Sequence, residues 1–205
     1  FYGPVTFLKQ MKNEIEAEKN SSEEGNNNKV NQFENMPQMA GFTAHMVLKL
    51  GYKESSSRTF ILTAQDANGV SMQAYFAPGD SFTLCATDRH GSEHSMPIPF
   101  NRNGVPIAQM IDLSLAVGSD FKRTVIRVGV NGSVIAQRIV PVPIGPFKDP
   151  WRHEIGKSLT TDGRMTAGDG APFDLYEAAM WHFFIGNNEE KSISKALIEN
   201  WQIEA

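Results

Sequence analysis

The stretch from Phe121 to Val140 constrains the fold of this chain more than any other. Apolar and polar residues alternate over 124–130 and again over 134–139. Alternation of this kind is typical of strands that bury one face. Asn131-Gly132 separates the two runs, and this dipeptide tolerates the positive φ angles of a tight type I′ turn. The sequence therefore predicts a β-hairpin.

Further antiparallel strands are expected beside this hairpin. The segment Phe42–Leu50 alternates well, with Phe42, Ala44, Met46, Leu48 and Leu50 on one face. The other expected strands are Thr59–Gln65, Val70–Ala77, Ser81–Thr87, Ile107–Val117, His153–Leu159 and the aromatic-rich Asp174–Ile185, which we expect at the centre of a sheet. Short polar turns join the strands between 59 and 87, with no helical pattern between them, so a parallel sheet is excluded there.

Two segments are expected to be irregular. We interpret Asp88–Gly104 as a long loop, with a short extended piece around Met96–Phe100. After Val140, four prolines exclude a central strand and indicate an extended surface crossing: Pro141, Pro143, Pro146 and Pro150.

The two ends of the chain carry helical patterns. Residues 1–19 are predicted to form a helical segment, because Phe7, Leu8, Met11 and Ile15 share one stripe. This stripe either packs on the sandwich or meets copies of itself, which would make a homo-oligomer. Residues 20–29 read as a flexible linker, and 30–205 as the β-domain, starting with a short edge strand before Pro37. Asn187 or Asn188 is expected to cap a short C-terminal helix that buries Ile193, Ala196, Leu197 and Trp201.

Composition bounds the function. The 205 residues, 40% of them hydrophobic, suit one antiparallel β-sandwich of jelly-roll type. The net charge of −4 gives no basic field for nucleic acid, and no apolar run is long enough for a membrane-spanning helix. The single cysteine, Cys85, excludes an intrachain disulfide, and we interpret it as a buried core residue. Phe1 in place of Met suggests a processed chain or part of a larger polypeptide.

The order of these features resembles the concanavalin A-like lectin and glucanase superfamily, in its laminin G-like branch. The residues that carry the likeness are the V-N-G hairpin within 126–136, the I-G strand at Ile155-Gly156, and the closing strand, loop and helix within 171–201. The resemblance implies a β-sandwich. It implies little about activity, because the superfamily contains lectins, adhesion modules, glycosidases, lyases and structural domains.

The sequence argues against a glycosidase. A retaining enzyme of this fold holds its carboxylates on one strand face, as in E-x-D-x-E, and no such run occurs. We expect Asp112, Glu154 and Glu177 to face solvent from single strand positions. Asp174 and Glu177 are three residues apart and are expected on opposite faces of their strand.

Other site chemistries are weighed against simpler interpretations. Calcium is the one cofactor considered, with oxygen ligands from Asp66 and Asn68, or from Asp162 and Asp169, although such residues also simply build turns. His90 and His94 suit a metal site only on a helix, which the loop sequence disfavours. For glycan binding, side chains in the expected loops can stack on sugar rings or bond hydroxyls: Tyr52, Arg89, Asn101, Arg102 and Trp151. The loops 88–103 and 160–169 are the favoured location.

We therefore predict a non-catalytic recognition or adhesion module for a glycan or protein partner, in an extracellular, cell-surface or virion setting. A structural decoration or tail component of a phage particle is the alternative. A polysaccharide-degrading enzyme is the third hypothesis, and the missing carboxylate array counts against it.

Overall fold

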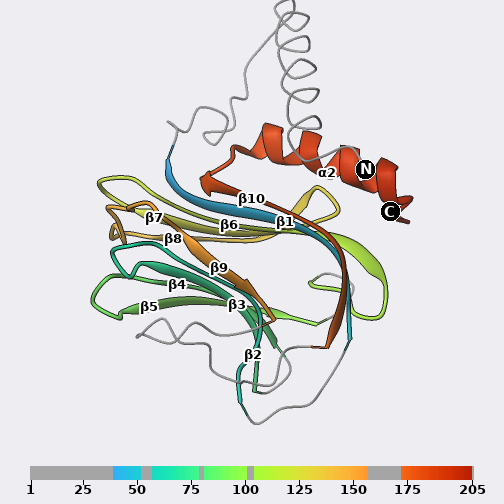
Figure 1. Cartoon of the computed structure of the whole chain (residues 1–205), viewed down its shortest axis with the longest axis horizontal. Helices are drawn as coiled ribbons and strands as arrows, with labels where there is room; N and C mark the ends of the chain where they lie inside the picture. Colours follow the sequence, from blue (N-terminus) through green and yellow to red (C-terminus); the bar gives the residue numbers. More distant parts are fainter. Residues whose placement is uncertain (1–38, 52–56, 79–80, 101–103, 157–171, 205) are drawn as a thin grey trace, which may run out of the picture. The chain divides into compact units, whose positions relative to one another are not determined.

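The computed structural model describes residues 39–51, 57–78, 81–100, 104–156 and 172–204. Within these ranges the chain forms two antiparallel five-stranded sheets packed face to face, with one helix outside them (Figure 1). Sheet A has the order β10 (Phe173–Phe183), β1 (Ala40–Leu50), β6 (Met110–Ser119), β7 (Thr124–Val130), β8 (Ser133–Val140). Sheet B has the order β5 (Glu93–Pro99), β4 (Ser81–Thr87), β3 (Ser71–Ala77), β2 (Thr59–Gln65), β9 (Arg152–Ile155). The predicted β-sandwich is confirmed.

The space between the sheets is filled by aliphatic and aromatic side chains from both inner faces. The face of β1 that the alternation assigned to the core, from Phe42 to Leu50, is fully buried there. Leu115 on the neighbouring strand β6 and Leu84 on β4 of the facing sheet are part of the same core. Burial of each large side chain contributes about 1.5–3 kcal/mol, so this interface supplies most of the fold's stabilisation. Cys85 is also fully buried, as expected, and its burial raises the pKa of the thiol.

The predicted hairpin is β7 and β8. Asn131 and Gly132 both have positive φ, 49° and 76°, as the type I′ turn requires. The pairing runs from Thr124 opposite Val140 to Val130 opposite Ser133.

Two strands differ from their predicted state. The segment expected as a loop contains β5, which pairs with β4 along its length. Pro97 and Pro99 have no backbone N–H to donate. They are tolerated because β5 is an edge strand, so one of its sides needs no hydrogen bonds, and residues two positions apart lie on the same side of a strand. Strand β10 lies at the edge of sheet A, not at its centre. One of its aromatic side chains packs on the C-terminal helix: the ring centroids of Tyr176 and Trp201 lie 5.6 Å apart.

A β-bulge changes which side chains share a face of β10. Val47 on β1 pairs with Glu177, whereas the next residue, Leu48, pairs with Leu175, so β10 holds one extra residue here. Lys49 then pairs with Asp174. Since Val47 and Lys49 point to the same side of β1, their partners Glu177 and Asp174 also share a face. The expected opposite orientation of these two carboxylates is therefore wrong.

The proline-rich segment 141–151 forms no strand, as predicted, and it crosses from sheet A to sheet B. It joins the end of β8 to the start of β9 without regular structure. Backbone bonds attach it to the turn between β2 and β3, where Ala67 N donates to Lys148 O at 2.9 Å. The crossing therefore ties the two sheets together at one end of the sandwich.

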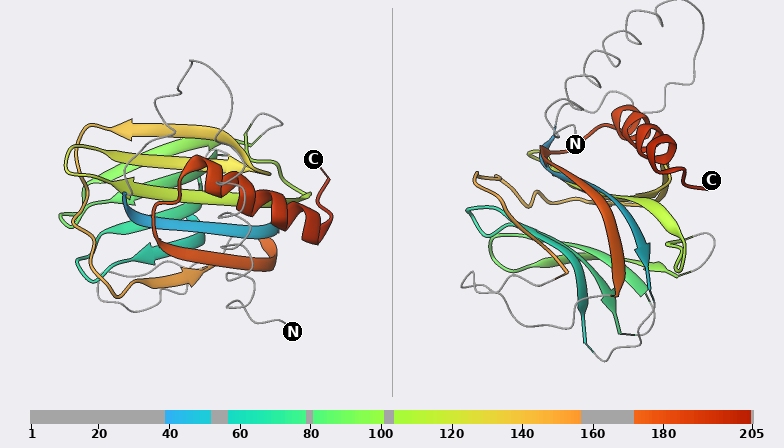
Figure 2. Two further views of the ribbon diagram at one scale, coloured as in Figure 1. Left: turned by 90° about the horizontal axis from the view of Figure 1, so that it is seen from above. Right: turned by 45° about the vertical axis from the view of Figure 1, so that its right-hand side comes forward.

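The helix α2 (Asn187–Trp201) runs across the outer face of sheet A (Figure 2). Its N-cap is Gly186, which has no side chain to cap the helix. The prediction of an asparagine cap is therefore wrong. Ile193 and Leu197 are buried as predicted, whereas Ala196 and Trp201 are half-buried. Glu190 and Ser194 are the buried residues that an apolar stripe does not reveal.

The N-terminal helix over residues 1–19, the linker over 20–29 and the edge strand before Pro37 lie outside the described residues. No helix in the part of the chain that the structure describes is long and apolar enough to cross a membrane.

Candidate functional site

Three regions of the molecule gather polar or exposed side chains that the apolar core does not explain. The first is the α2 cluster, which lies between sheet A and α2 and consists of His45, Asp112, Ser114, Arg127, Glu190 and Ser194. All six side chains are buried. The sheet positions alternate with the core residues of β1, β6 and β7, so they point away from the core and toward the helix.

Asp112 is the acceptor on one side of the α2 cluster. Its carboxylate lies 3.1 Å from His45 Nδ1 and accepts a hydrogen bond from Ser194 Oγ. Asn131 Oδ1 also accepts from the backbone N–H of Asp112 at 2.9 Å. The prediction that Asp112 faces solvent is wrong, because α2 covers the outer face of its strand.

Arg127 and Glu190 form the other side of the cluster. Their side chains make a buried ion pair, and Ser114 Oγ donates to the same Glu190 carboxylate. Arg127 Nη2 also donates to Ile185 O at 2.6 Å, and the guanidinium lies 4.5 Å from the Phe184 ring centroid. Burial lowers the pKa of Arg127, and the Glu190 carboxylate partly offsets that shift.

The α2 cluster contains serine, histidine and aspartate, but their order does not suit nucleophilic catalysis. A triad places the histidine between the serine and the carboxylate. Here both Ser194 and His45 bind Asp112, and all three side chains are at most 1% exposed. This arrangement holds α2 on the sheet and offers no access to a substrate.

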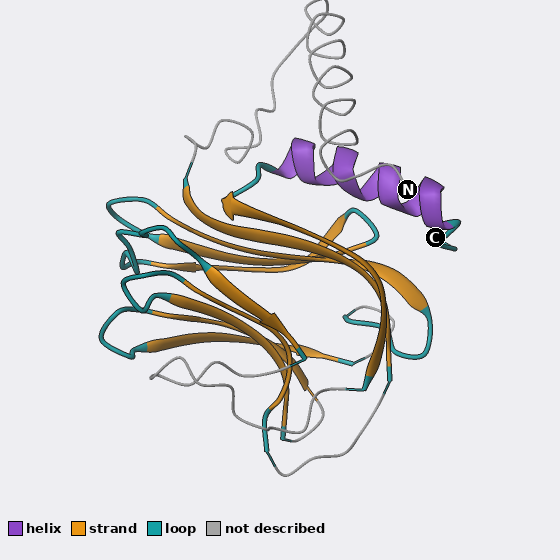
Figure 3. Cartoon of the chain, viewed as in Figure 1, coloured by secondary structure: helices purple, strands orange, loops and turns teal. Residues whose placement is uncertain are grey.

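The second region is the turn end, formed by the β2–β3, β4–β5 and β6–β7 turns together with the 141–151 crossing (Figure 3). An aspartate fixes the backbone of each turn. Asp66 Oδ1 accepts from the N–H groups of Asn68 and Val70, both at 2.8 Å, and its Oδ2 accepts from Lys148 N at 2.7 Å.

The other two turns follow the same design. Asp88 Oδ1 accepts from His90 N at 2.8 Å and from Ser92 N at 2.9 Å. Asp120 Oδ1 accepts from Lys122 N at 2.7 Å and from Arg123 N at 2.8 Å. The Ser92 backbone bond lowers the pKa of Asp88, and the Lys122 backbone bond lowers that of Asp120. The turn end is therefore held in one backbone conformation.

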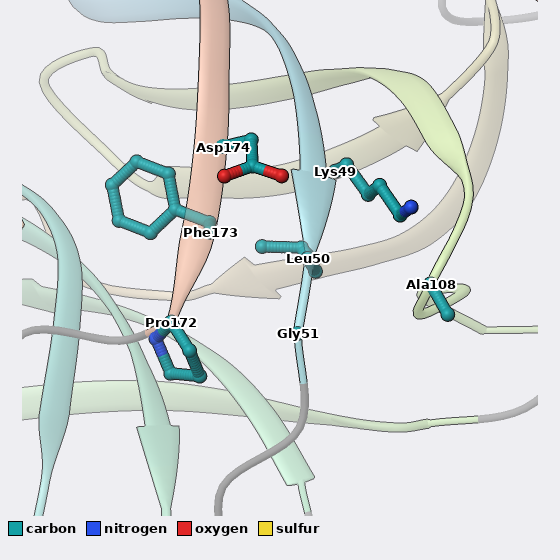
Figure 4. A pocket seen from close by; sticks show the side chains of 7 residues that line it. All are labelled: Lys49, Leu50, Gly51, Ala108, Pro172, Phe173 and Asp174. Carbon is teal, nitrogen blue, oxygen red and sulfur yellow. The ribbon is translucent and has the colours of Figure 1, made fainter.

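The third region is a pocket at the opposite end of sheet A, where β1 ends and β10 begins (Figure 4). Its volume is about 240 Å³, and Lys49, Leu50, Gly51, Ala108, Pro172, Phe173 and Asp174 line it. Gly51 N donates to Pro172 O at 2.7 Å, which closes the gap between the two strands. In Figure 4 the Asp174 carboxylate turns from β10 toward β1, and Lys49 leaves β1 on the side of Ala108.

The pocket combines an apolar floor with two charged groups at its edge. Lys49 and Asp174 are register partners, and both side chains are exposed. Neither forms an ion pair with any other residue that the structure describes. A ligand at this position can therefore bond a cationic donor and an anionic acceptor without displacing an existing salt bridge.

The structure distributes the predicted site residues over different places. Trp151 is a correction: it is 8% exposed, and its ring packs 5.2 Å from Phe42 in the core, so it cannot stack on a sugar. Arg89 is exposed at the turn end, where its Nε donates to His90 Nε2 at 3.0 Å. Tyr52, Asn101, Arg102, Asp162 and Asp169 lie outside the described residues. Tyr52 directly follows the pocket residue Gly51 in the sequence.

The expected metal ligands that the structure describes are turn-forming residues. Both carboxylate oxygens of Asp66 accept backbone N–H groups, and the Asn68 amide donates to Pro146 O at 3.0 Å. His90 lies in a turn and His94 on β5. Over the described ranges, no group of three or more His, Cys, Asp or Glu side chains is placed to hold a metal ion.

Sequence reasoning did not identify two exposed features. The first is the pair of Lys49 and Asp174. Both were predicted to lie on strands, but they are far apart in the sequence, so their pairing was not predicted. Phe121 is fully exposed in the β6–β7 turn. The exposure of Phe121 could have been predicted, because it is the one aromatic residue in the polar run Asp120-Phe121-Lys122-Arg123.

No protein-family model matches the sequence, and no curated protein matches it. Solved structures do resemble its fold. The heptameric SAP-like pentraxin from Limulus polyphemus has a TM-score of 0.55 at 14% identity, covering 77% of this chain and 71% of the pentraxin. The receptor-binding domain of botulinum neurotoxin C/D mosaic serotype has a TM-score of 0.53 at 9% identity, covering 78% of this chain and 37% of that domain. The binding domain of Paraclostridial Mosquitocidal Protein 1 has a TM-score of 0.50 at 9% identity, covering 78% and 38%.

These likenesses define the fold class. The described part of the chain is a lectin-like jelly-roll β-sandwich, as its resemblance to the concanavalin A-like superfamily implied. At identities of 9–14% the likeness establishes the fold alone. The narrower placement in the laminin G-like branch stays a prediction.

Proposed function

We propose that this chain is a non-catalytic recognition module that binds a glycan at the pocket of Figure 4. The observation that carries the proposal is the pairing of an apolar floor with the exposed Lys49 and Asp174 at its edge. A sugar presents C–H faces to apolar surface and hydroxyls to charged or polar groups. The pocket offers both within one small volume.

The roles of the pocket residues follow from their chemistry. The Asp174 carboxylate accepts hydrogen bonds from sugar hydroxyls, and the Lys49 ammonium donates to hydroxyl or ring oxygens. Leu50 and Pro172 supply apolar lining, whereas the Phe173 ring turns away from β1 and packs against the core. A Cβ on Gly51 would lie 3.1 Å from Pro172 O, so the absence of a side chain permits the close strand contact that shapes the pocket.

The structural neighbours support a binding role in a general way. Two of them are described as binding domains: the receptor-binding domain of a botulinum neurotoxin and the binding domain of a mosquitocidal protein. Because the chain spans 37–38% of those domains, their receptors are not carried over. The proposed setting remains extracellular, cell-surface or virion.

A glycan array probed with the full chain, with and without calcium, tests this function. Calcium independence is expected if only the described residues form the site. Hydrogen bonds to charged groups contribute about 1.5–3 kcal/mol, so Asp174→Asn should weaken binding of any hit by about tenfold or more. Glu199→Gln, an exposed carboxylate of α2, is the matched control and should bind as the parent does.

Two results contradict the proposal. One is a folded protein that binds nothing on a broad array. The other is a glycan whose affinity is unchanged by both Asp174→Asn and Lys49→Ala, since that ligand would bind elsewhere on the molecule.

A further inference from the structure

Phe121 is the most exposed large apolar side chain in the described part of the molecule. Its side chain is 100% exposed, whereas the other large apolar residues on the surface reach at most 44%. A phenylalanine wholly in water gains nothing from the hydrophobic effect and packs against nothing in the fold. Its position therefore has no explanation within the described chain.

The β6–β7 turn holds Phe121 outward on a fixed backbone. Asp120 accepts from the two N–H groups that follow Phe121, and its own N–H donates to Arg123 O at 3.0 Å. Ser119 Oγ donates to Arg123 O at 3.2 Å. These bonds fix the backbone of the turn, and the turn places the fully exposed Phe121 at its projecting tip.

Other exposed apolar residues lie at the same end of sheet A. Val142, at the start of the crossing, is 44% exposed, and its carbonyl accepts from Thr124 Oγ1 at 2.8 Å. Phe183, at the end of β10, is 42% exposed. Both Phe183 and Ser119 pair with Ala40, which places Phe183 in the same transverse row as the start of the turn.

Cations accompany these apolar side chains. Lys122 follows Phe121 directly and is exposed, and Lys148 is exposed on the crossing. No ion pair joins either lysine to another residue of the described chain. The neighbouring carboxylate, Asp120, is already engaged with backbone N–H groups and with Arg123 Nε at 3.3 Å. Within the β6–β7 turn, Asp120 faces two cations, Lys122 and Arg123, so the turn is locally basic on a chain whose net charge is −4, whereas Lys148 is followed by the exposed Asp149.

We infer that the β6–β7 tip docks on an anionic lipid membrane surface, with Phe121 entering the interface and Lys122 facing the headgroups. Aromatic side chains favour the boundary between headgroups and acyl chains, and lysines near an anionic leaflet are attracted to it. A protein partner requires a broad complementary surface, whereas this feature is a narrow projecting turn. The inference is independent of the proposed glycan pocket, which lies at the other end of β1.

Vesicle sedimentation with the full chain tests this inference. Binding is expected to vesicles of phosphatidylcholine mixed with phosphatidylserine, and to be weaker with phosphatidylcholine alone. Phe121→Ala should reduce the partition coefficient by about tenfold or more, the effect of one buried aromatic side chain. Val134→Ala, which shortens an exposed apolar residue of β8, is the matched control and should change nothing.

A second variant reports insertion directly. Phe121→Trp should retain binding, and its emission should be quenched by brominated lipids beyond any quenching of the three native tryptophans. Lys122→Glu should weaken binding to anionic vesicles and leave binding to neutral ones unchanged.

The inference is overturned if the folded chain binds no vesicles, or if Phe121→Ala binds them as tightly as the parent. A change of oligomeric state in Phe121→Ala without a change in vesicle binding also overturns it, and would assign the tip to contact between copies of this chain.

Discussion

The two faces of sheet A are built by opposite means, although they alternate along the same strands. The inner face is apolar, and its side chains, such as Leu115, contact the core. The outer face under α2 carries the α2 cluster, in which buried ionisable and hydroxyl groups pair with one another, while His45 Nε2 and Arg127 Nε have no hydrogen-bond partner within the described chain. The inner face gains free energy from burial in almost any well-packed arrangement, whereas the outer face is favourable only when every partner is present.

The largest effect should follow removal of one charge from the outer face. Arg127→Ala leaves the Glu190 carboxylate buried without its cation, and we expect a loss of about 3–5 kcal/mol in the free energy of unfolding. Urea denaturation followed by circular dichroism measures this. A loss below about 1 kcal/mol would show that water or a rearranged helix compensates Glu190, contrary to the burial of this ion pair.

A slightly smaller loss in the free energy of unfolding is expected when a core side chain of the inner face is truncated. Leu115→Ala deletes buried methyl groups and leaves a cavity, at a cost of about 2–5 kcal/mol. The same denaturation measurement applies, with Val134→Ala as the exposed control. If Leu115→Ala costs less than the control, the inner face is not the packed core of the fold.

Loss of one hydroxyl from the α2 cluster should have an intermediate effect. Ser194→Ala removes a buried donor to Asp112 and should cost about 1 kcal/mol, with α2 becoming easier to open by hydrogen exchange. Ser192→Ala lies two positions away on the same helix and bonds only Asn188 O, so it is the matched control. Equal losses in the two variants would contradict the role given to the Ser194–Asp112 bond.

Replacing both members of the ion pair should cost less than removing Arg127 alone. With Arg127→Met and Glu190→Leu together, no buried charge is left unpaired, although Ser114 Oγ and Ile185 O each lose a partner, so we expect a smaller loss in the free energy of unfolding than for Arg127→Ala. The double-mutant cycle with the single variants gives the coupling directly. Additive losses would mean that the two residues do not act as a pair.

The smallest effect is expected where a half-buried carboxylate bonds the backbone of a surface turn. Asp120 has a lowered pKa in the folded state. Its stabilising contribution is therefore complete above the ordinary pKa of about 3.9 and is lost as the pH falls through the lowered folded value. An NMR titration of the Asp120 carboxyl carbon should give a lower midpoint in the native protein than in urea. Equal midpoints would contradict the turn geometry.

Local chemistry made much of the fold predictable. Asn131-Gly132 specifies its hairpin through φ angles alone, and the alternation along β1 identifies the buried inner face without knowledge of any partner. The outer face was not predictable in this way. Asp112 reads as a solvent-facing strand residue, because its burial depends on a helix that begins far along the chain.

The candidate sites were harder to predict than the fold for the same reason. Asp174 and Lys49 meet only through long-range strand pairing, with a bulge setting their relation to Glu177. Trp151 reads as a loop residue because its surroundings are rich in proline, but the crossing folds its ring under Phe42. Neither side-chain environment is encoded within a short window of sequence.

The position of β1 also bears on how the protein is made. This strand has no free edge: it pairs with β6 on one side and with β10 on the other, so Ala40 must find both Ser119 and Phe183. During translation, sheet A therefore stays incomplete until β10 has left the ribosome. Until then, one edge of this long apolar strand is unpaired and open to pairing with other nascent chains.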